Sequence, residues 1–105
     1  MKNWTETDFL SGEVVWLEEC REEDMLQVRY PHNYTLDMGW YEGDGKYIIY
    51  IIKDHEWGVP VVRYSAESEE DMTVLLQQAA ERIEHESQTN KTYYGGLWTT
   101  EEISL

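Results

Sequence analysis

The chain has 105 residues, of which 22 are Asp or Glu and 8 are Lys or Arg, and its formal net charge is −14. Nucleic acids and anionic membranes bind cationic surfaces, so eight scattered basic residues on this background argue against both as partners. Hydrophobic residues make up 41% of the chain and include 5 Trp and 8 Tyr, which a disordered acidic tail would lack. We therefore expect a folded protein with a basic partner, and the alternative is that the acidity serves only solubility.

The length fits one domain over residues 1–105, with a lead-in at 1–12 and an aromatic tail at 88–105. Cys20 is the one cysteine, which excludes an internal disulfide and fits a reducing compartment. The N-terminal residues lack the apolar core of a signal peptide, and the longest apolar run, residues 47–52, is too short to span a membrane. We expect a cytoplasmic protein.

The first half of the chain predicts strands. Residues 13–17 are rich in β-formers and predict a short strand, although the start of a helix is an alternative. A charged connection follows at 18–24. Residues 25–30 alternate apolar and polar side chains, as a half-buried strand does.

The clearest strands form a predicted antiparallel meander over residues 34–64. Residues 34–41 alternate, a glycine-containing turn follows at 42–45, and residues 46–53 are apolar on both faces, as in a central strand. A second turn at 54–58 leads to a third strand at 59–64. Pro60 near its start predicts an edge position or a bulge there.

The region after the strands predicts one amphipathic helix at about 68–87. Ser68 followed by Asp71 is typical of a helix start, and acidic residues in the first turn suit the helix dipole. The apolar stripe consists of Met72, Leu75, Leu76, Ala79, Ala80 and Ile83. The fold class is therefore α+β: an antiparallel β-sheet of about 4–5 strands with the helix packed on one face.

No specific catalytic set is present in the sequence. His55-Glu56 does not begin a zinc motif, because Val59 stands where the second histidine belongs. The carboxylates around Cys20 disfavour its thiolate, which argues against a nucleophilic role. Most acidic residues lie in runs or turns, where solvation keeps them ionised. We expect no enzyme activity, no metal and no cofactor.

The acidic residues instead gather in patches, which we predict to bind a protein partner. Trp57, beside a turn glycine, is a candidate aromatic anchor, whereas Trp40 continues the apolar alternation and is expected in the core or at its rim. The turns at 42–45 and 54–58 are expected at opposite ends of the central strand. The candidate partner-binding residues are Glu18, Glu19, Glu22, Glu23, Asp24, Asp37, Glu42, Asp44, Asp54, Glu56 and Trp57.

Residues 34–83 resemble small bacterial immunity proteins that accompany polymorphic toxins, including those of contact-dependent growth inhibition systems. The pattern is Leu36-Asp37-x-Gly39-Trp40, then a strand, then Asp54-x-x-Trp57, Pro60 and a helix that starts with acids. The resemblance implies a partner that is a basic toxin domain, often a nuclease, whose phosphate-binding site an acidic surface covers.

Two other functions use the same features. A phage-type DNA mimic that inhibits restriction or CRISPR machinery also needs acids, but it needs them spaced like phosphates along an elongated face. A generic acidic protein-interaction module needs no defined acidic site.

Overall fold

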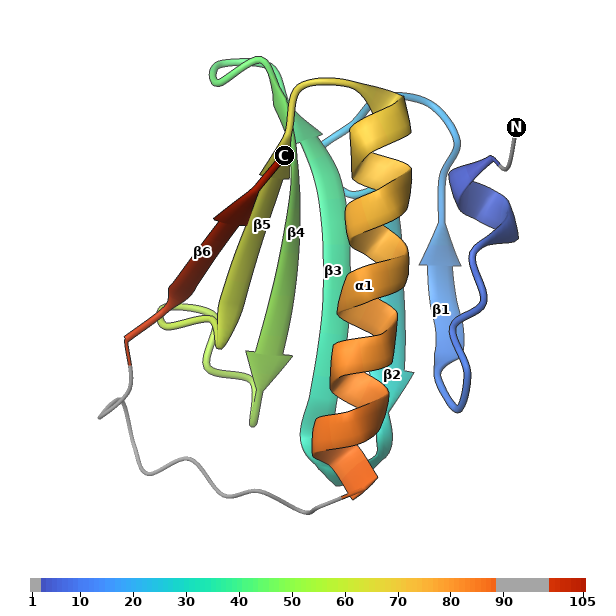
Figure 1. Cartoon of the computed structure of the whole chain (residues 1–105), viewed down its shortest axis with the longest axis vertical. Coiled ribbons are helices and arrows are strands. Elements are labelled where there is room, and N and C mark those ends of the chain that lie inside the picture. The colour runs from blue at the N-terminus through green and yellow to red at the C-terminus, as the bar shows by residue number, and fades with distance from the viewer. Residues whose placement is uncertain (1–2, 89–98) are drawn as a thin grey trace.

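Hydrophobic alternation along the chain produces a six-stranded sheet with one long helix on one of its faces (Figure 1). The computed structural model describes residues 3–88 and 99–105. The helix is α1 (Glu69–Gln88), and short 3-10 turns form at η1 (Trp4–Glu6) and η2 (Pro31–Asn33). The strands follow chain order across the sheet: β1 (Glu13–Leu17), β2 (Leu26–Tyr30), β3 (Tyr34–Tyr41), β4 (Lys46–Lys53), β5 (Val62–Ala66) and β6 (Glu101–Ser104).

Every neighbouring pair of strands is antiparallel except β5 and β6, which are parallel. The predicted meander through β3, β4 and β5 is confirmed, as is the α+β class. The sheet exceeds the predicted 4–5 strands because residues near the C-terminal end of the chain join it as β6. Residues 13–17 form the strand β1 and not the start of a helix.

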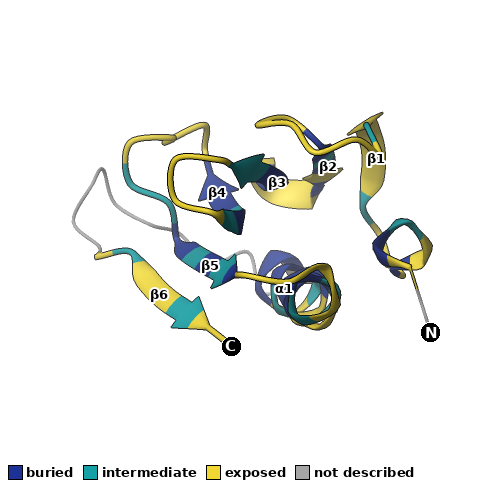
Figure 2. Ribbon diagram, turned by 90° about the horizontal axis from the view of Figure 1, so that it is seen from above, coloured by how far each residue is buried: buried dark blue, intermediate teal, exposed yellow. Residues whose placement is uncertain are grey.

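The core lies between the sheet and α1, where Figure 2 shows the buried segments facing each other. Leu36 and Met38 of β3 face the helix together with Ile49 and Ile51 of β4. The apolar stripe of α1 covers them, and all six of its residues are at most 1% exposed. The predicted helix is therefore confirmed with bounds shifted by one residue.

The start of α1 has the predicted cap. The Asp71 backbone N–H donates to Ser68 Oγ at 3.1 Å, and the Met72 N–H donates to the Ser68 carbonyl at 3.0 Å. These bonds satisfy donors that a helix start otherwise leaves free. Three acidic residues in the first turn, Glu69, Glu70 and Asp71, complement the helix dipole.

The third strand of the predicted meander is present, but its predicted bounds of 59–64 and the edge or bulge at Pro60 were wrong. β5 starts at Val62 and lies between β4 and β6, and Pro60 precedes the strand. Because Pro60 lies outside the strand, its missing backbone N–H interrupts no hydrogen bond between strands. The Pro60 carbonyl instead accepts a hydrogen bond from Thr100 Oγ1 at 2.7 Å, just before β6 begins.

The two ends of the chain both contribute to the fold. In the predicted lead-in, Trp4 and Phe9 join the core, and the Trp4 side chain is only 1% exposed. Residues 101–104 of the predicted tail form β6, and Arg82 of α1 pairs with Glu101 at 2.9 Å. The aromatic part of that tail, at 93–98, lies outside the described residues. Over the part of the chain that the structure describes, no helix is long and apolar enough to cross a membrane.

Candidate functional site: an acidic end and the outer face of the sheet

Half of the acidic residues lie at one end of the sheet, which we call the acidic end. It comprises the loop at 18–24, the turn at 42–45 and the start of α1 at 67–71, which the strand registers bring to the same end (Figure 1). Arg21 is the only basic residue in these segments. The eleven acids are Glu18, Glu19, Glu22, Glu23, Asp24, Glu42, Asp44, Glu67, Glu69, Glu70 and Asp71. Patches that the sequence left separate thus share one surface region.

The loop at 18–24 is held against the end of β3. The Trp40 N–H donates to the Glu22 carbonyl at 2.7 Å, and the Met25 N–H donates to the Met38 carbonyl at 3.0 Å. Between these bonds the Glu23 carbonyl lies so close to Gly39 that a Cβ there would be 1.8 Å from it. A glycine at position 39 therefore allows the acidic loop to lie on the sheet.

The Arg21 side chain gives this loop a second attachment. Its guanidinium carbon lies 4.6 Å from the centre of the Trp40 ring, and its Nε donates to the Tyr47 hydroxyl at 3.1 Å. Trp40 and Tyr47 contact each other edge to face at 4.8 Å. Trp40 is therefore partly buried at the rim of the core, as expected, and serves as a platform for the loop.

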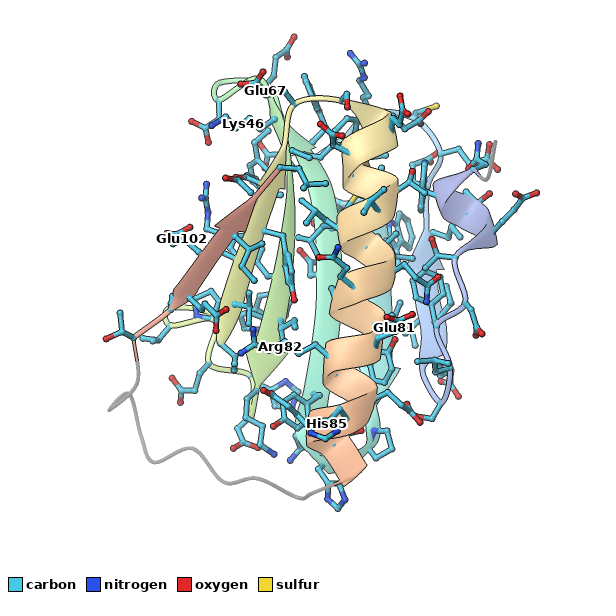
Figure 3. All side chains as sticks on the ribbon, viewed as in Figure 1. Lys46, Glu67, Glu81, Arg82, His85 and Glu102 are labelled. Carbon is cyan, nitrogen blue, oxygen red and sulfur yellow. The ribbon has the colours of Figure 1, made fainter. Side chains whose placement is uncertain are left out.

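The other predicted patch, Asp54 and Glu56, lies at the opposite end of β4, as the sequence predicted. Asp54 forms an ion pair with the buried Lys53 at 3.4 Å, so part of its charge is balanced. Figure 3 places His85 at this end and Glu67 and Lys46 at the acidic end. Asp54 and Glu56 therefore do not belong to the acidic end.

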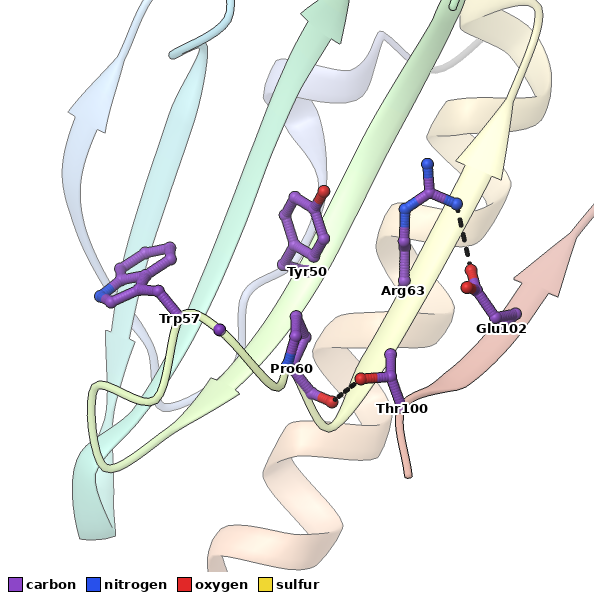
Figure 4. Close-up of a pocket in the computed structure, with 7 residues that line it drawn as sticks. Tyr50, Trp57, Pro60, Arg63, Thr100 and Glu102 are labelled. Carbon is purple, nitrogen blue, oxygen red and sulfur yellow. Dashed lines mark hydrogen bonds and ion pairs between the residues drawn. The ribbon is translucent and has the colours of Figure 1, made fainter. Parts of the chain in front are cut away.

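The sheet face away from α1, which we call the outer face, has a row of polar and aromatic side chains. Cross-strand partners share a face, so the register assigns this row residue by residue. From β1 to β6 it runs Trp16, Gln27, Asp37, Tyr50, Arg63 and Glu102. The Arg63 guanidinium donates to Glu102 at 3.0 Å, and Tyr50 is its cross-strand neighbour on β4 (Figure 4).

Trp57 reaches this outer face from the loop after β4. Its side chain is 48% exposed and lines a hollow of about 370 Å³ with Tyr50, Pro60 and Arg63 (Figure 4). Trp57 is therefore a surface aromatic residue and not part of the core. Interfaces are enriched in such residues, so the structure leaves Trp57 as a candidate anchor.

The sequence pattern placed Asp37 in an acidic patch along the first hairpin, where water would keep it ionised. The structure shows that Asp37 is buried. Only 8% of the residue is exposed, because β3 lies in the middle of the sheet with strands on both sides. Burial, and then the charge of Asp24, raise the pKa of Asp37 to about 6, while a hydrogen bond with Gln27 opposes the shift. The sequence prediction failed because it took the polar face of the alternation to be open to water.

Asp37→Asn is expected to raise the free energy of unfolding at pH 7.5 by about 1–2 kcal/mol. Since the folded pKa lies above the unfolded value, the native state holds an extra proton between about pH 4 and pH 6. The free energy of unfolding of the wild type therefore falls as pH rises through that window, and the difference in stability between Asp37→Asn and wild type grows. Urea denaturation at pH 4.5, 6 and 7.5 measures this difference. The exposed Asp44→Asn is the control, and a pH-independent advantage for Asp37→Asn would contradict the prediction.

Trp16 is the residue that the sequence analysis missed. All five residues of β1 are exposed, and Trp16 is 53% exposed on the outer face. The register of β1 against β2 shifts between Val14 and Trp16, so Val15 is an extra residue. The signal was present in the sequence, because two adjacent valines break the alternation that a regular strand would show.

Cys20 and the possible metal ligands are the remaining groups of chemical interest. The pKa of the Cys20 thiol is raised above its usual value, first by the Glu18 carboxylate, which agrees with the expectation that its thiolate is disfavoured. Among residues 3–88 and 99–105, no three His, Cys, Asp or Glu side chains are grouped as metal ligands.

Comparison with known proteins adds no relative: no family model, no curated protein and no solved structure matches the chain.

Proposed function

We propose that this protein is an immunity protein that binds a basic toxin domain, a nuclease, and covers its active site with an acidic surface. One observation carries the proposal: eleven of the 22 acidic residues lie in three segments at one end of the sheet, where the basic residues are Arg21 within those segments and Lys46 directly after the 42–45 turn. The proposal also rests on the resemblance of residues 34–83 to such proteins.

An acidic end of this kind suits a nuclease because nuclease active sites bind phosphates with cationic side chains. Complementary charge speeds the encounter, and an immunity protein has to capture its toxin before damage occurs. Opposite charges that become desolvated around aromatic anchors then slow dissociation. The acidic end is compact, since the whole molecule measures 35 × 28 × 22 Å. A DNA mimic needs its acids in an elongated row, so this arrangement favours a protein that plugs an active site.

Co-expression tests the proposal. The product of the gene immediately upstream should stop bacterial growth when expressed alone, and this protein should restore growth and co-purify with that product. The proposal fails if the upstream product is harmless or if growth is not restored. Rescue without a complex would also contradict it.

Reversing charge at the acidic end is expected to slow association with that toxin. The double variant Glu22→Lys/Glu23→Lys should lower the association rate constant about tenfold at low salt and leave the dissociation rate nearly unchanged, because exposed charges act mainly on the encounter. Its stability should stay within about 1 kcal/mol of wild type. Stopped-flow mixing at several salt concentrations measures the effect.

The matched control is Glu56→Lys/Glu81→Lys, which changes the net charge equally with exposed acids outside the acidic end. It should slow association less than threefold. Equal slowing by both variants would show that net charge, and not the acidic end, guides the encounter.

A further inference from the structure

We propose that a hollow on the outer face, between β1 and β3, receives an arginine side chain of the basic partner. The hollow has a volume of about 480 Å³ and is lined by Val15, Trp16, Asp24, Gln27, Arg29 and Asp37. The identity of the partner rests on the proposed function, whereas the preference of the hollow for a guanidinium group is a property of this chain that can be tested alone.

The irregularity in β1 forms one wall of the hollow. Because Val15 is the extra residue there, both Val15 and Trp16 line the same hollow, although neighbours in a regular strand point to opposite faces. The Trp16 indole N–H donates to the Asp24 carbonyl at 3.0 Å, which fixes the ring against the loop at 18–24. Trp16 nevertheless stays 53% exposed, which leaves ring surface open to a ligand.

The Asp37 carboxylate forms the opposite wall, and among the described residues it makes no ion pair. The residue is more than nine-tenths buried, and its hydrogen-bond partner is the neutral Gln27. In the same row of the outer face, Arg63 is engaged by Glu102 at 3.0 Å. Arg29 lines the hollow, but within the described part of the chain no ion pair joins it to Asp37 or Asp24. A buried carboxylate without a cation is costly unless a partner supplies one.

An arginine side chain suits this hollow better than a lysine side chain or a second copy of this protein. A planar guanidinium can stack on an indole ring and bond carboxylates with several N–H groups at once, whereas an ammonium group is a compact point charge. A second copy of this chain is disfavoured, because each copy has a net charge of −14. The hollow also borders the acidic end through Asp24, so a cationic surface drawn to that end arrives beside it.

An NMR titration with Nα-acetyl-arginine amide tests the hollow without any toxin. The Trp16 indole N–H signal should shift in a saturable manner, and Trp16→Ala or Asp37→Asn should weaken binding at least fivefold. Trp57→Ala is the matched control, because Trp57 is equally exposed on the same face, and it should change binding less than twofold. Nα-acetyl-lysine amide should bind at least threefold more weakly. Shifts confined to the acidic end, or equal binding of both probes, would overturn the proposal.

The same titration has a pH readout. Among the described residues, the charged and titratable groups around Asp37 are Asp24 of the loop at 18–24, Arg29 of β2, Tyr41 of β3 and Tyr50 of β4. Because a protonated Asp37 cannot pair with a guanidinium, wild-type affinity for the arginine probe should rise at least threefold from pH 5 to pH 7.5. Asp37→Asn should remove this rise, and an unchanged pH dependence in that variant would count against the role of Asp37.

Binding to the toxin separates this proposal from the proposed function. With the upstream gene product, Trp16→Ala and Asp37→Asn should raise the dissociation constant at least tenfold, and Glu81→Gln, an exposed acid outside both the hollow and the acidic end, should raise it less than threefold. If the toxin binds and both variants match wild type, the hollow is not used and the proposed function stands. If no toxin is found while the arginine probe still binds at Trp16, the proposed function fails and the hollow remains an arginine site.

Discussion

Gly39→Ala is expected to lower the free energy of unfolding by about 3 kcal/mol or more. The added methyl group would lie 1.8 Å from the Glu23 carbonyl oxygen and 2.5 Å from its carbonyl carbon. These are backbone atoms, so no side-chain rotation relieves the clash. The loop at 18–24 would have to leave β3 and would lose the bonds from Trp40 to Glu22 and from Met25 to Met38. Urea denaturation at pH 7.5 measures the change.

Gly43→Ala is the matched control for that experiment. Gly43 lies in the turn between β3 and β4, and nothing lies within 4 Å of the position that its Cβ would take. Its replacement should change stability by less than about 1 kcal/mol. If Gly39→Ala were as mild as Gly43→Ala, the acidic loop would not rest on β3 as described.

Leu76→Ala is expected to destabilise the protein by about 2–5 kcal/mol. Leu76 is fully buried in the stripe of α1 that covers the sheet, so removal of its side chain loses apolar burial and leaves a cavity. The loss should appear as a lower urea midpoint with an unchanged slope, because the variant still unfolds in one step.

Val74→Ala on the same helix provides the comparison. Val74 is 47% exposed and lies outside the buried stripe. Its replacement should stay within about 0.5 kcal/mol of wild type, since alanine favours a helix and little packing is lost. Similar losses at positions 74 and 76 would contradict the assignment of the buried helix face.

The middle of the fold could be predicted from the sequence because its signals are local. The alternation of residues 34–41 and the apolar run at 46–53 have strand periods, and short turns force neighbouring strands to be antiparallel. The stripe from Met72 to Ile83 has the helical period, and the Ser68 cap marks where it begins. Each of these features depends only on residues a few positions apart.

The edge formed by β6 depends on distant residues and could not be predicted in the same way. β6 joins β5 through a parallel pairing between segments that the whole helix separates, and no local period indicates it. Pro60 was misjudged for a related reason: it lies outside the strand, so the rule that places prolines at edges did not apply.

The candidate site was predicted in part. The sequence located acids in turns correctly, but only the strand order showed that the 18–24 loop, the 42–45 turn and the start of α1 lie at one end. Asp37 was assigned to an open patch because burial on the outer face depends on neighbouring strands. Trp16 was missed because an extra residue in β1, and not a repeating pattern, determines where it points.

The concentration of acids at one end makes the molecule an electric dipole as well as an anion. As the protein approaches a positively charged partner, the electric field of that partner should rotate it before contact. The loop at 18–24 and the start of α1 should then face the partner. The same torque should orient it on a positively charged support, with the turn at 54–58 facing outward. A fluorophore or affinity label attached near Glu56 would then stay clear of the approaching surface.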